Sequence, residues 1–287
     1  MGSPMNFSDI FMLDYLHQCH ITGEGVGVAV LDTGAYPHHE LRNLVVFQDY
    51  INHRHDFYDD SGHGTHVAGI IGAEKLGAAP DCHLIILKVL DANGEGKTAH
   101  VLQAINWVIE HRLSYNIRII NISIGTISRR QTPDQPLISA VERAWDHGIT
   151  VVTAAGNHGP LPQSITTPGV SHKVITVGAC DDRLDPHLPR SYSGRGPTKS
   201  CIQKPDIVAP GSKIRSLAAS KNDYVKKSGT SMATPFVSGI LALTLQRFPD
   251  LTPKELKLKL YETSLDLGLT RNQQGWGLIN PRGLLEL

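Results

Sequence analysis

The sequence predicts a single α/β domain with a mostly parallel central β-sheet and helices on both faces. Short apolar, β-branched runs alternate along the 287 residues with longer segments of helical character. The apolar runs are continuous, as in strands that are covered on both faces. No repeat, low-complexity tract or linker divides the chain. We therefore expect one domain over residues 23–287, after an N-terminal segment of residues 1–22 whose opening Met-Gly-Ser-Pro is typical of a tag remnant.

Strands and helices are expected in alternation. Strands are predicted at residues 26–31, 84–89, 117–122, 149–153 and 174–177. Helices are predicted at residues 63–73, 99–111, 136–147, 230–247 and 253–263. The last helix has the clearest start, with Thr252 as its cap and Pro253 at its first position. Parallel strands joined by right-handed crossovers place reactive groups at the carboxyl ends of the strands.

Composition argues against several classes of function. Lys+Arg and Asp+Glu both number 27, and this balance disfavours a nucleic-acid binder. No apolar run approaches the roughly 18 residues that span a bilayer, and no basic-then-apolar signal segment opens the chain. Four cysteines lie far apart without a Cys-x-x-Cys motif: Cys19, Cys82, Cys180 and Cys201. They read as isolated thiols, so we expect a cytoplasmic protein, with a secreted form that has lost its leader as the alternative.

Two motifs place a carboxylate and an imidazole beside predicted turns. Residues 30–34 read Val-Leu-Asp-Thr-Gly and put Asp32 at the end of an apolar strand, where a simple turn-forming role is the alternative. Residues 61–69 read Ser-Gly-His-Gly-Thr-His-Val-Ala-Gly, and the glycines around His63 would let substrate and backbone approach the ring. A metal site using His63 and His66 is disfavoured, because the zinc-protease helix needs an i, i+4 spacing and an adjacent glutamate.

A third motif places a serine at the start of a helix. Residues 228–235 read Ser-Gly-Thr-Ser-Met-Ala-Thr-Pro, so Ser231 lies on a glycine-containing turn. Free N–H groups and the helix dipole at such a start would stabilise a developing negative charge. The alternative is a serine that only caps the helix.

The three motifs together resemble, in sequence and in order, the triad motifs of the subtilisin-like serine proteases, or subtilases. The resemblance extends from about residue 23 to residue 277. It implies that Ser231 is the nucleophile, that His63 is the general base, and that Asp32 orients the imidazole. It also implies a serine endopeptidase that works through an acyl-enzyme. His66 would then be structural, about one helical turn further along.

A fourth motif adds an oxyanion donor. Residues 152–159 read Val-Thr-Ala-Ala-Gly-Asn-His-Gly, which by itself is only a good turn. The segment resembles the oxyanion-hole strand and loop of the same family. The resemblance implies that the side chain of Asn157 donates to the oxyanion beside the Ser231 backbone N–H.

The resemblance also implies a polypeptide substrate bound as an extended strand. Residues 94–96 and 121–126 are similar to the family segments that pair with the substrate backbone. The implied substrate-binding residues are Gly94, Glu95, Gly96, Ser123, Ile124, Gly125, Ala154, Ala155 and Gly156, with Thr166 at the floor of the first pocket. A β-branched floor should shorten that pocket, so leucine or methionine is expected in preference to tryptophan or arginine. His158 and Glu95 are expected at pocket rims.

No cofactor is expected for the chemistry. Many relatives bind calcium in a loop after the catalytic histidine, but residues 70–81 offer few oxygen ligands here. We therefore expect that tight site to be absent and leave open a weaker site near residues 167–182. The family usually carries a pro-region that assists folding and blocks the site, yet only 31 residues precede Asp32. Either such a region lies outside this chain or the protein does without one.

Three other functions compete with this interpretation. A catalytically silent binding protein on the same fold would typically lack a triad member, and none is missing here. An esterase of the α/β-hydrolase type has the order Ser…Asp/Glu…His around Gly-x-Ser-x-Gly, and the sequence shows neither feature. A narrower alternative is maturation of one particular peptide instead of general degradation, and the sequence does not separate these two.

Overall fold

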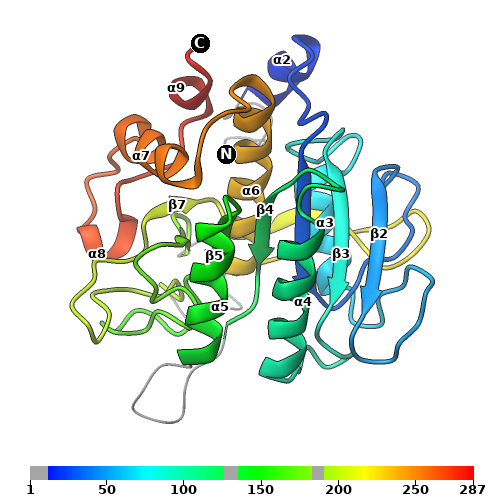
Figure 1. Cartoon of the computed structure of the whole chain (residues 1–287). Helices are drawn as coiled ribbons and strands as arrows, with labels where there is room; N and C mark the ends of the chain where they lie inside the picture. The colour runs from blue at the N-terminus through cyan, green and yellow to red at the C-terminus, as the bar shows by residue number, and fades with distance from the viewer. Residues whose placement is uncertain (1–11, 126–134, 183–190) are drawn as a thin grey trace.

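A seven-stranded parallel sheet forms the centre of the computed structural model, which describes residues 12–125, 135–182 and 191–287 (Figure 1). The strand order is β2-β3-β1-β4-β5-β6-β7. The strands are β1 Gly27–Asp32, β2 Leu44–Asp49, β3 His83–Lys88, β4 Ile117–Ile122, β5 Thr150–Ala154, β6 Ile175–Ala179 and β7 Ile207–Ala209. A separate antiparallel pair consists of β8 Ile214–Leu217 and β9 Tyr224–Lys227.

All five predicted strands are confirmed to within about two residues, as β1 and β3 to β6. Strands β2, β7, β8 and β9 were not expected from the sequence. Strand β2 is the outer strand beside β3 and most of its residues are only partly covered. Strand β7 has three residues, and β9 reads Tyr-Val-Lys-Lys and is largely exposed. Such short or half-exposed runs lack the long apolar signature of a central strand.

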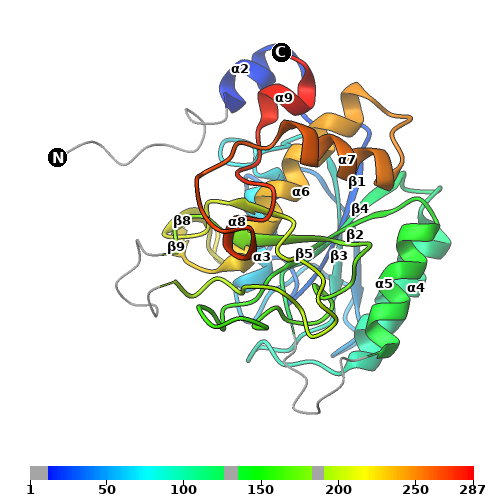
Figure 2. The ribbon, with the colours of Figure 1, turned by 90° about the vertical axis from the view of Figure 1, so that its left-hand side faces the viewer.

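Helices cover the sheet in two layers, as expected. They are α2 Leu13–Gln18, α3 His63–Gly72, α4 Thr98–His111, α5 Gln135–Asp146, α6 Thr230–Arg247, α7 Pro253–Thr263, α8 Arg271–Gln274 and α9 Pro281–Leu285. Helices α4 and α5 lie together on one side of the sheet, and α3 and α6 lie on the other (Figure 2). Along β1, Val28 and Val30 join the core with α3 and α6, whereas Ala29 and Leu31 join the core with α4 and α5.

The five predicted helices are confirmed, and the start of α7 has the expected cap. The Thr252 hydroxyl accepts from the Glu255 N–H while the Glu255 carboxylate accepts from the Thr252 N–H. Helix α2 was not expected; its Leu13 and Leu16 are buried in the core that also contains α6. Residues 1–11 of the predicted N-terminal segment lie outside the described residues, and the boundary at residue 23 stays a prediction.

Within residues 12–125, 135–182 and 191–287, no helix is both long enough and apolar enough to cross a bilayer.

Candidate active site

Asp32 and His63 meet at the carboxyl edge of the sheet. Asp32 ends β1 and is fully buried, and His63 is the first residue of α3. The Nδ1 atom of His63 lies 2.7 Å from Oδ1 of Asp32. Because an ionised carboxylate only accepts hydrogen bonds, Nδ1 carries the proton. The same Oδ1 accepts from the Thr33 N–H at 2.7 Å, so both donors fix the orientation of this carboxylate.

Two glycines allow the helix of His63 to approach the turn after Asp32. A Cβ atom on Gly64 would stand 2.1 Å from the Gly34 carbonyl oxygen, and one on Gly34 would stand 2.2 Å from the Tyr58 carbonyl oxygen. Gly34 also has φ 118°, which disfavours any residue with a side chain. The Asp-Thr-Gly and His-Gly motifs therefore fit together by close backbone contact.

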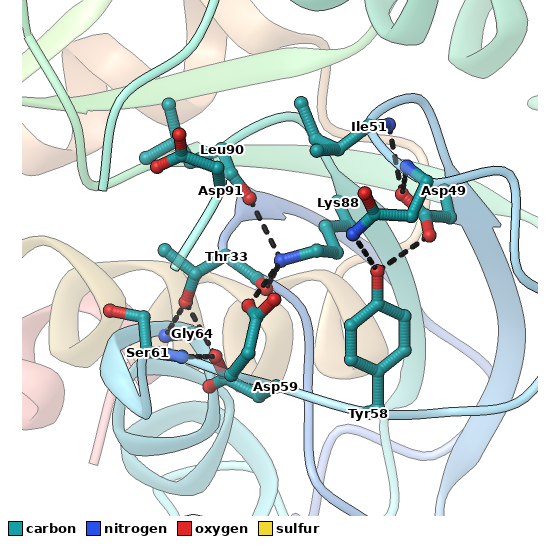
Figure 3. A network of polar contacts seen from close by, with 12 residues as sticks. Thr33, Asp49, Ile51, Tyr58, Asp59, Ser61, Gly64, Lys88, Leu90 and Asp91 are labelled. Carbon is teal, nitrogen blue, oxygen red and sulfur yellow. Dashed lines mark hydrogen bonds and ion pairs between the residues drawn. The ribbon is translucent and has the colours of Figure 1, made fainter. Parts of the chain in front are cut away.

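Asp59 joins these two segments through its buried carboxylate. It accepts from the Thr33 hydroxyl at 2.9 Å, from the backbone N–H groups of the Ser61-Gly62 turn, and from both the N–H and the hydroxyl of Thr65. The Thr33 hydroxyl in turn accepts from the Gly64 N–H at 2.8 Å (Figure 3). Burial alone would raise the pKa of Asp59, but these hydrogen bonds outweigh it and the pKa is lowered. An ionised Asp59 thus fixes the turn of Asp32 against the helix of His63.

The electrostatic surroundings of His63 favour its charged form on balance. Burial disfavours an imidazolium, but the charge of Asp32 and its hydrogen bond outweigh burial and raise the pKa of His63 above the usual 6.5. Lys227 of β9 opposes this rise. Its ammonium donates to the Gly62 carbonyl at 3.1 Å, and burial lowers its own pKa. Lys227 therefore places a cation beside the imidazole, a feature that sequence reasoning missed.

Ser231 lies in the first turn of α6. The residue that caps this helix is Gly229, with φ 149°, so Ser231 is not a helix cap. The Ser231 hydroxyl donates to the Ser123 carbonyl at 2.7 Å. Its own N–H belongs to the four that have no partner within the helix. Ser231 and His63 line the same cleft.

Asn157 follows β5 and is oriented by the residue before Ser231. Its Oδ1 accepts from the N–H of Thr230 at 2.9 Å and from the Thr230 hydroxyl at 3.0 Å. The side-chain amide nitrogen therefore keeps its donors for another partner. Asn157 itself is exposed and lines the cleft with Ser231.

The cleft has a volume of about 470 Å³ and brings most of the predicted residues together. Its lining includes His63, Ser231, Asn157, His158, Gly94, Ser123, Ile124, Gly125, Ala154, Gly156 and Thr166. Glu95 and Gly96 line an adjoining hollow of about 350 Å³, together with apolar Val101, Ile122 and Leu137. The two hollows share Leu90, Gly94, Ile124 and Gly125. Residue 126, the last of the segment 121–126 that was expected to pair with the substrate backbone, lies outside the described residues.

Thr166 fills the space between the two walls of the cleft. A Cβ atom on Gly125 would stand 2.2 Å from Thr166 Oγ1, and one on Gly156 would stand 2.5 Å from Thr166 Cγ2. Ala155, by contrast, does not line the cleft among the described residues. It is fully buried, and its carbonyl accepts from the Thr166 N–H at 3.0 Å. Ala155, which was expected in the pocket wall, therefore holds the floor residue Thr166 in place through this hydrogen bond.

His66 is separate from the Asp32–His63 pair. It is fully buried, and its Nε2 lies 3.1 Å from the Ile214 carbonyl and 3.2 Å from the Val225 carbonyl, so it joins β8 and β9 to α3. Burial is the main cause that lowers the pKa of His66 to about 4. In the described part of the chain, no group of three or more His, Cys, Asp or Glu side chains is arranged to hold a metal ion.

Comparison with known proteins gives a consistent set of similarities. A sequence profile of the subtilase family matches residues 23–277. Serine protease AprX of Bacillus subtilis is 44% identical in an alignment 268 positions long, which covers 83% of this chain and 60% of AprX. Subtilisin Savinase of Lederbergia lenta is 36% identical and is covered over 92% of both chains. The crystal structure of a cold-adapted subtilisin-like serine proteinase has a TM-score of 0.74 at 32% identity, over 90% of this chain and 88% of that one.

Proposed function

The chain belongs to the subtilase family, and from this premise we propose that it is a serine endopeptidase with Asp32, His63 and Ser231 as its catalytic triad. The observation that carries the proposal is the 2.7 Å contact between His63 Nδ1 and Asp32 Oδ1, in a cleft that Ser231 also lines. The chain spans 60% of the length of AprX.

The chemistry follows from this arrangement. The Ser231 hydroxyl turns from the Ser123 carbonyl towards His63, whose unprotonated Nε2 takes the proton as Oγ attacks the scissile carbonyl. Asp32 stabilises the imidazolium that forms. The Ser231 N–H and the Asn157 amide stabilise the oxyanion. His63 then protonates the leaving amine. Water attacks the acyl-enzyme while His63 accepts its proton, and His63 returns that proton to Ser231 Oγ as the carboxylic acid product leaves.

We infer that the substrate is an extended polypeptide. Residues 94–96 and 123–125 lie along the two hollows, where a peptide backbone could pair with both. The 350 Å³ hollow is lined largely by apolar side chains and suits an apolar residue upstream of the scissile bond. General degradation and maturation of one peptide both fit this site, and cleavage of a random peptide library would separate them.

A serine-directed fluorophosphonate tests the proposed activity directly. We expect stoichiometric labelling of Ser231, identified by mass spectrometry of the tryptic peptide, and parallel loss of casein hydrolysis. Hydrolysis of simple esters without cleavage of any peptide or protein would contradict the endopeptidase assignment. Absence of both labelling and hydrolysis would favour a silent binding protein.

Replacing Asn157 tests the oxyanion role. Asn157→Ala is expected to lower kcat by about 10²–10³ with little change in KM, because the donor meets the oxygen only as charge develops. Asn157→Asp is the matched control, since its carboxylate still accepts from the N–H and hydroxyl of Thr230. An equal or larger loss in this variant, measured with a peptide anilide, supports the donor role. A rise in KM alone would refute it.

The pH dependence reports the state of His63. The raised pKa of His63 places its deprotonation above 6.5, and only neutral His63 can accept the Ser231 proton. Activity should therefore rise with pH through a step that lies above 6.5. Initial rates from pH 5 to 9 in buffers of constant ionic strength provide the measurement. A rate that is highest at pH 5 would be incompatible with this role.

The floor residue Thr166 is expected to set the preference for the residue before the scissile bond. Because Thr166 occupies the space between Gly125 and Gly156, leucine or methionine should be favoured over tryptophan or arginine. Among the described residues that line the main cleft, none is acidic. Thr166→Gly should raise kcat/KM for phenylalanine relative to leucine by on the order of tenfold, measured on matched peptide anilides. Strong preference for arginine in the parent protein would refute this placement of Thr166.

Calcium binding, a pro-region and cellular location stay predictions. Residues 70–79 fold back on α3 through N–H bonds from Ala78 and Ala79 to the carbonyls of Ile70 and Ile71. Glu74 pairs with Arg42 at 3.1 Å. Both features agree with the prediction that this loop lacks a tight calcium site. All four cysteines are free thiols, as a cytoplasmic location would allow, although the 34% identical Epr of Bacillus subtilis is named an extracellular protease.

A further inference from the structure

Lys88, the last residue of β3, is a buried lysine at the carboxyl edge of the sheet. Its side chain has no exposed surface. In the sheet it stands between Asp32 of β1 and Asp49 of β2. Burying an ammonium group carries a large desolvation penalty, and an apolar side chain of similar size could fill the same space without it. The position therefore points to a task for the charge and its hydrogen bonds.

Every donor of the Lys88 ammonium has an acceptor. Nζ donates to the Thr33 carbonyl at 2.6 Å, to Oδ1 of Asp60 at 2.7 Å and to the Leu90 carbonyl at 2.9 Å. Figure 3 shows the Thr33 and Leu90 contacts converging on this atom. An ammonium group has three N–H donors, so the three contacts saturate it. The Tyr58 ring, 5.0 Å from Nζ, adds a cation–π contact.

The three acceptors belong to three different parts of the proposed site. Thr33 follows Asp32 in the turn that meets the helix of His63. Asp60 follows Asp59 in the loop that leads to His63. Leu90 opens the segment of residues 90–96, whose glycines line the hollows where we place the substrate backbone. A single buried charge thus connects the Asp32–His63 pair to one edge of the substrate cleft.

The Asp32–His63 pair is held by contacts that do not involve Lys88. Asp59 fixes Thr33 and the start of α3 through its own hydrogen bonds. The segment of residues 90–96 is tied less firmly to this part of the molecule. Val89, directly before the segment, donates to the Asp32 carbonyl at 2.9 Å. Within the segment, Leu90 donates to the same carbonyl only at a long 3.3 Å, and its own carbonyl has the Lys88 ammonium as a partner. Loss of the ammonium should therefore release the substrate edge more than the triad.

We propose that Lys88 is a positioning residue, which holds the substrate edge of residues 90–96 in register with the Asp32–His63 pair so that an extended peptide presents its scissile bond to Ser231. The inference rests on the proposed endopeptidase function. A displacement of about 1 Å at this edge would cost on the order of 10²-fold in rate for a substrate that depends on it.

The test compares Lys88→Met with the parent protein on two substrates. Both are p-nitroanilides with leucine before the scissile bond; one is an acetylated tetrapeptide that reaches residues 94–96, and the other is acetyl-leucine p-nitroanilide, which does not. Rates are referred to active sites titrated with the fluorophosphonate. We expect kcat/KM to fall by about 30-fold or more for the tetrapeptide and by less than about threefold for the short substrate. Equal falls on both substrates, or no fall, would overturn the proposal.

Lys204→Met is the matched control. Lys204 is also fully buried, and it donates to Asp206 at 2.5 Å and to the Val174 carbonyl at 3.0 Å, none of which lines the cleft. This variant should lose thermal stability while it keeps the ratio of tetrapeptide to short-substrate activity. A fall of that ratio in both variants would show a general effect of losing a buried lysine and would overturn the proposal.

A second variant covers the case in which Lys88→Met does not fold. Asp60 is the partly exposed partner, with a side chain that is 36% exposed, so Asp60→Ala should fold. Asp60→Ala should lower the ratio of tetrapeptide to short-substrate activity by about threefold. An unchanged ratio would refute the positioning role. Activity and labelling of the parent protein test the proposed function separately, so an active parent with an unchanged ratio in the variants defeats only this inference.

Discussion

Ser231→Ala should lower kcat for peptide hydrolysis by on the order of 10⁶, the magnitude typical of removing a subtilisin-type nucleophile. The variant retains the oxyanion donors and the cleft, but it has no oxygen that can form the acyl-enzyme. The fold should survive. The Ser231 hydroxyl donates one hydrogen bond, to the Ser123 carbonyl, and it does not cap the helix, because the cap residue is Gly229.

The measurement combines peptide-anilide hydrolysis, fluorophosphonate labelling and a thermal melt. Ser228→Ala is the matched control on the same segment, since the Ser228 hydroxyl accepts from the Lys213 N–H at 2.8 Å and Ser228 does not line the cleft. That control should keep most of the activity and the label. Labelling at another residue in Ser231→Ala, or activity within about a thousandfold of the parent after contamination is excluded, would remove Ser231 from the triad.

The central strands could be predicted because their burial on both faces requires uninterrupted apolar residues in the local sequence. Runs such as residues 84–89 and 117–122 are apolar without interruption, as both faces of the sheet are covered. The edge strand β2 and the pair β8–β9 could not be predicted in this way. Most residues of β2 and β9 are partly or fully exposed, and β8 has only four residues. The β8–β9 hairpin also packs on a segment distant in sequence, since His66 contacts the carbonyls of Ile214 in β8 and Val225 in β9.

The proposed catalytic residues were indicated by sequence because each lies in a short motif with its own local geometry. The glycines at positions 34 and 64 are required by contacts of 2.2 and 2.1 Å, and they appear in the sequence beside Asp32 and His63. Asp59 and Lys88 were missed. Their roles depend on partners that are distant in sequence, such as Thr33 for both residues. A pair of acidic residues directly before Ser-Gly-His-Gly was the available signal for the Asp59-Asp60 loop.

Replacing Asp32 should give the next largest loss of kcat. It is fully buried, and its Oδ1 accepts from both His63 Nδ1 and the Thr33 N–H. In Asp32→Asn, the amide oxygen can keep the Thr33 bond while the NH₂ group faces His63 Nδ1. An NH₂ group donates, so His63 would carry its proton on Nε2 and could not accept one from Ser231.

Asp32→Asn should therefore lower kcat by about 10⁴ with a small change in KM. The low-pH side of the rate–pH profile, or acid limb, should also shift in the residual activity. The charge and hydrogen bond of Asp32 raise the pKa of His63, whereas burial and Lys227 lower it. Without the carboxylate, burial and Lys227 lower the pKa of His63 against only the smaller raising effect of Asp59, so the acid side of the pH profile should move to lower pH than in the parent. Steady-state rates of titrated enzyme from pH 4.5 to 9 measure both effects. A kcat within tenfold of the parent, or an acid limb that stays in place, would show that Asp32 does not orient and charge-stabilise His63.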